Sequence, residues 1–108
     1  LDLAQALSHH SASDKAILVD CLTLWLSNLM TLSRDIDAET ERLVSVLPSL
    51  QSPVVFVTNE VGLGIVPAND IARAFRDHAG KLHQSVARAA DRVVLMVAGL
   101  PMSLTQAN

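Results

Sequence analysis

Two apolar runs in the sequence end in polar side chains that could hold a metal ion or contact a phosphate. The run Ala16-Ile-Leu-Val ends in Asp20, and the run Val54-Val-Phe-Val ends in Thr58-Asn59-Glu60. A carboxylate at the end of a hydrophobic strand is the Walker B pattern, in which it helps to hold Mg²⁺ beside nucleotide phosphates. The same aspartate could instead cap a following helix by accepting a hydrogen bond from a first-turn amide. Spacing alone leaves both roles open for Asp20.

Three more residues are candidates for nucleotide contacts. Asn59 could contact a phosphate or anchor its own turn, since asparagine side chains readily bond the nearby backbone. Glu60 could act at the site, or it could pair as an ordinary loop carboxylate with Arg73 or Arg76. Arg76 could reach a nucleotide or a neighbouring subunit, or it could be a solvated arginine. We favour the site role for Glu60 and leave the other two open.

These groups can meet only if the two runs form neighbouring parallel strands. Asp20 and Glu60 would then share one edge of the sheet, which is where open α/β sheets bind ligands. A phosphate cradle is missing, because no G-x-x-x-x-G-K-[ST] motif occurs and Gly62-Leu-Gly64 has no Lys-Ser after it. We read these glycines as residues that let the backbone turn, not as ligand contacts. The sequence therefore predicts half of a Mg²⁺–nucleotide site.

A chain of alternating strands and helices has to position this site. Apolar runs predict strands over residues 16–20, 54–57 and 92–99, and apolar periodicity predicts helices over residues 1–7, 22–32, 35–47 and 68–90. Strands separated by helices indicate parallel crossovers, so we expect one mostly parallel sheet with helices on both faces and strands buried on both sides. Leu100-Pro101 should end regular structure. Residues 1–108 form a single α/β domain in this interpretation.

Composition limits the function classes. Half of the residues are hydrophobic, 18% are charged and the net charge is −3, so no basic field exists to attract nucleic acid. Polar residues interrupt every apolar run before it could span a bilayer. The lone Cys21 rules out a disulfide within the chain and makes a reducing cytoplasm the expected compartment. The adjacent His9 and His10 are expected to be solvated, with no other ligand at zinc spacing nearby.

Longer motifs carry a family resemblance. They are Asp20-Cys-Leu-Thr-Leu-Trp-Leu-Ser-Asn28, Thr58-Asn-Glu-Val-Gly-Leu-Gly-Ile-Val-Pro67, Arg73-Ala-Phe-Arg-Asp77, Ala79-Gly80, Gln84 and Val97-Ala-Gly-Leu-Pro101. Together they resemble the bifunctional adenosylcobinamide kinase / adenosylcobinamide-phosphate guanylyltransferase family of cobalamin biosynthesis. The resemblance runs from about Ile17 to Pro101 and covers most of the chain.

The resemblance implies a RecA-like P-loop NTPase fold, assembled as a trimer in the cytoplasm. Such an enzyme phosphorylates adenosylcobinamide with ATP or GTP, then takes GMP from GTP onto a histidine and passes it on to give adenosylcobinamide-GDP. Asp20 falls where the family places its Walker-B-type carboxylate, which contacts the nucleotide and Mg²⁺. His83 stands where asparagine is more usual in the family.

The family's P-loop and GMP-accepting histidine both lie upstream of the matched region. His9 and His10 sit too close to Asp20 to take the histidine's role, so no catalytic residue is assigned within the chain. The chain also begins in a helical pattern without an initiator methionine. We therefore expect the C-terminal part of such an enzyme, lacking the N-terminal P-loop part and inactive alone.

Two other interpretations remain open. The chain could be a non-catalytic α/β module that serves oligomerisation, because residues 22–32 are apolar nearly all round. It could also be another nucleotide enzyme on a Rossmann-like sheet. The second option rests on Gly62-Leu-Gly64 alone, which lacks the third glycine and the following acidic residue of that fingerprint.

Overall fold

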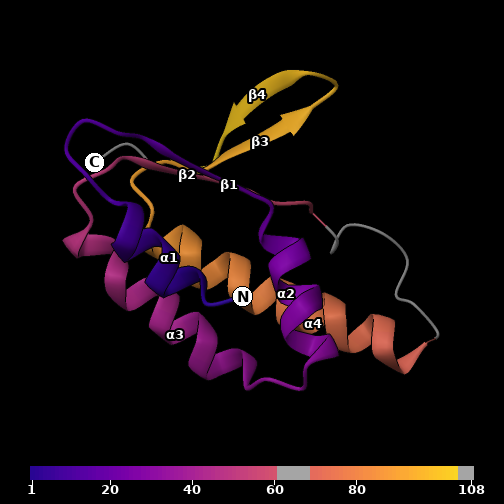
Figure 1. Cartoon of the computed structure of the whole chain (residues 1–108). Coiled ribbons are helices and arrows are strands. Elements are labelled where there is room, and N and C mark those ends of the chain that lie inside the picture. Colours follow the sequence, from indigo (N-terminus) through magenta and orange to yellow (C-terminus); the bar gives the residue numbers. More distant parts are fainter. Residues whose placement is uncertain (61–68, 105–108) are drawn as a thin grey trace.

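The computed structural model describes residues 1–60 and 69–104 of the chain. Its elements follow the predicted order, with one strand added at the end (Figure 1). They are α1 (Leu3–His10), β1 (Ile17–Asp20), α2 (Leu22–Thr31), α3 (Ile36–Val46), the 3₁₀ turn η1 (Leu47–Ser49), β2 (Val54–Val57), α4 (Asp70–Ala89), β3 (Val94–Val97) and β4 (Leu100–Ser103). Gly62, Gly64 and Pro67, which were expected to shape a turn, lie outside the described residues.

Three of the four helices begin at a side chain that accepts hydrogen bonds from their first turn. Asp2 caps α1, Asp35 caps α3, and Asn69 accepts from the amides at the start of α4. Each cap satisfies an amide that would otherwise have no partner inside its helix. The cap position of α2 is Cys21, which makes no side-chain capping bond. Asp20 therefore does not cap α2, and this alternative for Asp20 is wrong.

The strands β1 and β2 pair in parallel, as the sequence predicted for them. Their register joins Ile17 to Val54 at one end and Asp20 to Val57 at the other. The two polar termini thus lie at the same edge of the pair. This edge faces the start of α2, since Asp20 is followed at once by the cap residue of that helix.

The core lies between this strand pair and the helices. All four helices lie on one side of β1 and β2 (Figure 1). The fully buried side chains of the core come from these helices: Leu7, Leu22, Leu26, Leu29, Leu43 and Leu82. From the strands, Ile17, Val19, Val54 and Phe56 pack against them. The remaining large apolar strand residues point the other way, and Leu18 and Val55 are 67% and 59% exposed.

The expectation of strands buried on both faces and helices on both sides of the sheet is therefore wrong for the described residues. A short apolar run has the same composition whether one or both of its faces are covered, so the sequence could not separate the two cases. The alternation along β1 and β2 follows from the two-residue period of a strand, which sends successive side chains to opposite faces.

The third strand also departs from expectation. β3 does not join β1 and β2; it pairs antiparallel with β4 in a separate hairpin, with Val94 opposite Ser103. The hairpin turns through Ala98 and Gly99, which both have positive φ. Two such residues in a row are typical of the tight turns that join antiparallel strands. The sheet is thus not mostly parallel in the described residues, and regular structure continues past Leu100-Pro101.

Among the described residues, no helix is both long enough and apolar enough to cross a membrane.

Trp25, expected in the core, is 8% exposed, and its indole N–H donates a 2.9 Å hydrogen bond to the carbonyl oxygen of Leu1.

Candidate functional site

The candidate site is the edge where β1 and β2 end. Asp20 is the last residue of β1, and its Cα partner Val57 is the last residue of β2. The polar segment Thr58-Asn59-Glu60 begins with the next residue of the chain. Asp20 is exposed, so its carboxylate is accessible to a ligand. The structure therefore brings Asp20 and this segment to one rim.

Asn59 is tied to the start of α2. Its Nδ2 donates a 3.4 Å hydrogen bond to Oγ1 of Thr23, a buried hydroxyl in the first turn of that helix. The same oxygen lies 3.2 Å from Sγ of Cys21. Thr23 follows Asp20 by three residues, so this hydrogen bond ties Asn59 to the segment that begins where β1 ends.

Thr58 is tied to α4 on the other side. Its Oγ1 and Nε2 of His83 share a 2.6 Å hydrogen bond across 25 positions of sequence. Burial lowers the pKa of His83, and the negative charge of Glu60 opposes that shift. The lowered pKa favours the neutral form of the imidazole, and Glu60 is close enough to act on it. A neutral ring can either donate to or accept from a hydroxyl group.

The thiol of Cys21 also has a perturbed acidity. Its hydrogen bond with Thr23 lowers the pKa of Cys21, and an amide of the α2 first turn acts in the same direction. The nearby charge of Asp20 raises the pKa, as a smaller effect. Hydrogen bonds to a thiolate stabilise its charged form, so this thiol should ionise more readily than an ordinary cysteine.

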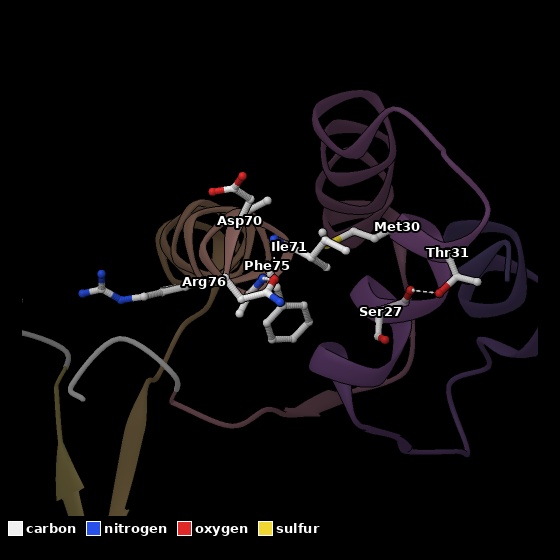
Figure 2. A pocket seen from close by; sticks show the side chains of 10 residues that line it. Ser27, Met30, Thr31, Asp70, Ile71, Phe75 and Arg76 are labelled. Carbon is white, nitrogen blue, oxygen red and sulfur yellow. Dashed lines mark hydrogen bonds between the residues drawn. The ribbon is translucent and has the colours of Figure 1, made fainter. Parts of the chain in front are cut away.

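Arg76 lies farther from the rim. It is seven residues before His83 on α4, which is nearly two turns, so both side chains leave the same face of that helix at a separation of roughly 10 Å along its axis. Figure 2 shows the guanidinium pointing away from Met30 and Thr31 of α2. The described contacts therefore do not bring Arg76 to Asp20, and its role in nucleotide binding stays a prediction.

A groove of about 1050 Å³ lies beside Arg76, between α2 and the first half of α4. Its walls are mostly apolar, with Ile71 and Phe75 from α4 facing Met30 from α2 (Figure 2). Its polar lining residues are Ser27, Thr31, Asn69, Asp70 and Arg76. The Thr31 hydroxyl donates a 2.9 Å hydrogen bond to the Ser27 carbonyl oxygen. The groove is distinct from the polar rim at the ends of β1 and β2.

The rim fits Mg²⁺ only with ligands from elsewhere. No group of three or more His, Cys, Asp or Glu side chains among residues 1–60 and 69–104 is arranged to hold a metal ion. One carboxylate such as Asp20 is still a suitable partner, because Mg²⁺ keeps several waters and is commonly held by one or two carboxylates together with substrate phosphates. His9 and His10 are exposed, as the solvated interpretation predicted, but they belong to the last turn of α1 and not to a loop; their ring centroids lie 4.9 Å apart.

Thr23 and His83 belong to the site but were not among its candidate residues. Thr23 is one polar residue within an apolar helical segment, and His83 lies within a long helical pattern. Which face of a helix meets a strand end depends on tertiary packing, which a single sequence does not specify. The sequence contains one indication for His83. It stands where asparagine is more usual in the family, and both side chains can form hydrogen bonds.

The comparisons with known proteins agree with the resemblance. The profile of the family described as "Cobinamide kinase / cobinamide phosphate guanyltransferase" matches residues 1–104. The "Bifunctional adenosylcobalamin biosynthesis protein CobP" of Pseudomonas aeruginosa is 43% identical over 106 residues, covering 96% of this chain and 61% of that protein.

Two further relatives, each named "Bifunctional adenosylcobalamin biosynthesis protein CobU", come from Salmonella typhimurium and Escherichia coli. The first is 40% identical over 108 positions, covering 86% of this chain and 60% of the relative. The second is 34% identical over 106 positions, covering 84% and 59%. The chain thus spans about three fifths of the length of these curated relatives. By its sequence and by these likenesses, the chain belongs to the cobinamide kinase / cobinamide phosphate guanyltransferase family.

Proposed function

We propose that this chain supplies the Walker B side of the nucleotide site in a bifunctional enzyme of cobalamin biosynthesis. The complete enzyme phosphorylates adenosylcobinamide with ATP or GTP, and then transfers GMP from GTP to give adenosylcobinamide-GDP. Family membership supports the pair of activities. The observation that carries the residue-level part is the parallel register of β1 and β2, which places Asp20 and the segment Thr58–Glu60 at one edge.

Each rim residue has a role in this proposal. Asp20 would hold Mg²⁺, as a Walker B carboxylate does. Mg²⁺ held there would supply positive charge to offset that of the phosphates. Asn59 orients the nucleotide side of the rim from its anchor on Thr23, and Glu60 contributes a second carboxylate nearby. Arg76 adds a positive charge on α4, which could contact a phosphate or a neighbouring subunit.

The remaining machinery is proposed to come from outside the 108 residues. The sequence contains no Gly-rich Lys-Ser loop to cradle phosphates. The GMP-accepting histidine is likewise assigned to a segment upstream, because neither His9 nor His10 reaches the rim in a described contact. Residues 1–108 then form one partial α/β domain of a RecA-like P-loop fold that does not catalyse alone. Assembly as a homotrimer in the cytoplasm is part of the same proposal.

One experiment separates this proposal from its alternative. Radiolabelled GTP would be offered to residues 1–108 and to the complete protein that contains them. We expect stoichiometric, Mg²⁺-dependent binding by the complete protein and none by residues 1–108. Tight binding by residues 1–108 would contradict the assignment of the phosphate cradle to another segment.

The alternative is a non-catalytic oligomerisation module. The exposed apolar face of β1 and β2 favours it, since Leu18 and Val55 lie open on that face. Apolar patches of this kind commonly mark interaction surfaces. A complete protein that assembles but neither binds GTP nor phosphorylates adenosylcobinamide would support the module and overturn the enzyme.

A further inference from the structure

The polar segment at the end of β2 is held from two sides by side-chain hydrogen bonds. Thr58 bonds to His83 of α4 at 2.6 Å, and the next residue, Asn59, bonds to Thr23 of α2 at 3.4 Å. The two anchors belong to different helices. The Thr58 contact is the shorter one, so its geometry restricts the segment more strongly.

The helix that carries His83 is firmly packed. Its neighbours Leu82 and Val86 are 1% and 8% exposed, and Ala79, one turn earlier, is fully buried. These residues fix the rotation of α4 against α2 and α3. His83 is therefore presented to Thr58 from a rigid element, whereas Thr58, Asn59 and Glu60 are exposed and follow the last residue of a four-residue strand.

We propose that His83 is a positioning residue of the rim: by holding Thr58, it fixes the tip of β2 so that Asn59 and Glu60 stay beside Asp20. The activity test of this role rests on the proposed function, because it measures the kinase reaction. His83 touches no reacting atom in this account, and it acts through the Thr58 hydroxyl. Without this contact, Asn59 and Glu60 can shift relative to Asp20. Small displacements of positioned groups slow reactions strongly.

The test uses the complete protein with four test variants and one control variant. Thr58→Val keeps the shape of threonine but removes the hydroxyl, and His83→Leu removes the ring nitrogen. Thr58→Val/His83→Leu combines both, and His83→Gln restores a group that can bond to Thr58. His78→Leu is the matched control, since His78 lies on the same helix beside a different cavity that α3 and α4 share.

We expect each single removal to lower kcat/KM for the kinase reaction by about five- to tenfold, as the loss of one hydrogen bond would. The double variant should be no slower than the slower single variant, because both changes remove one shared contact. His83→Gln should recover most of the rate, and His78→Leu should match the wild type. Multiplying losses in the double variant, or an unchanged rate in His83→Leu, would overturn the assignment.

A second readout does not depend on the reaction. In the NMR spectrum of the complete protein, the side-chain amide signals of Asn59 should shift in His83→Leu and stay in place in His78→Leu. If the wild-type protein showed neither activity, the proposed function would fail, yet the NMR comparison would still decide the role of His83. Unchanged Asn59 signals in His83→Leu would overturn it.

Discussion

Asp20 and Val57 are direct partners across two parallel strands, and they lie 37 positions apart in the sequence. This pairing is the reason that a carboxylate and the Thr58-Asn59-Glu60 segment share an edge. It also sets what each rim residue can be expected to do when it is changed.

The first prediction concerns Asp20. In the complete protein, Asp20→Asn should lower kcat for adenosylcobinamide phosphorylation on the order of 100-fold, because the carboxylate proposed to hold Mg²⁺ beside the phosphates is lost. Raising the Mg²⁺ concentration should restore part of the rate. The thermal unfolding midpoint should hardly change, since Asp20 is exposed and caps no helix. Asp14→Asn, an exposed carboxylate away from the rim, is the control, and equal losses in both variants would refute a metal role.

The core predicts a sharp contrast within one helix. Leu26 of α2 is fully buried, whereas Leu24, two residues earlier, is 59% exposed. Leu26→Ala should lower the free energy of unfolding by about 2–5 kcal/mol, which is the usual cost of removing a buried leucine side chain. Leu24→Ala should change it by less than about 1 kcal/mol. Urea denaturation of the complete protein would measure both, and similar losses would show that α2 packs differently.

Much of this architecture is readable in the sequence, and the part that is not has a physical cause. The apolar runs at 16–20 and 54–57 and the apolar periodicity of the helices are local signals, so the element order follows from them. The hairpin of β3 and β4 was missed because Ala98 takes a positive φ that alanine rarely adopts, and because Pro101 argued against a strand. Proline is tolerated there because β4 pairs on one side only among the described residues.

The candidate site shows the same division. The end of a hydrophobic strand is visible in a sequence, so Asp20 and Asn59 could be named in advance. Thr23, which bonds to Asn59, and His83, which bonds to Thr58, could not, because each contact joins residues 25 or more positions apart and depends on how the helices are rotated. Long-range side-chain contacts of this kind follow from the packed core, which forms only in the folded chain.

Cys21 should react with iodoacetamide at a lower pH than an ordinary cysteine. Its hydrogen bond with Thr23 lowers its pKa, and the thiolate is the reactive form. Thr23→Val removes that hydrogen bond and should move the midpoint of the rate-against-pH curve upward. Cys21 is the only cysteine of the chain, so mass spectrometry of its peptide reports on this residue alone. A curve that Thr23→Val leaves in place would show that the hydroxyl does not set the acidity.

His83 should make the stability depend on pH. Burial lowers its pKa in the folded protein below the ordinary value of 6.5, so the unfolded chain binds more protons in the interval below 6.5. The contribution of neutral His83 to the free energy of unfolding is therefore fully present above pH 6.5. It is lost as the pH falls toward the pKa of His83 in the folded protein. The free energy of unfolding, measured from pH 5 to 8, should fall less steeply with acid in His83→Gln than in the wild type. His78→Gln gives the control, and equal slopes in wild type and His83→Gln would contradict the direction of this pKa shift.

Residues 1–108 in isolation should self-associate through the face of β1 and β2 that none of the helices in residues 1–60 and 69–104 covers. Val55 on this face and Leu32 at the end of α2 are both 59% exposed, so they form a matched pair that differs in location. Large exposed apolar patches favour association, whereas single exposed apolar residues do not. Val55→Lys should therefore reduce the weight-average mass in sedimentation equilibrium, and Leu32→Lys should leave it unchanged. If residues 1–108 without either substitution were a dispersed monomer, this face would not drive association. If both substitutions lowered the weight-average mass equally, the association would not depend on this face.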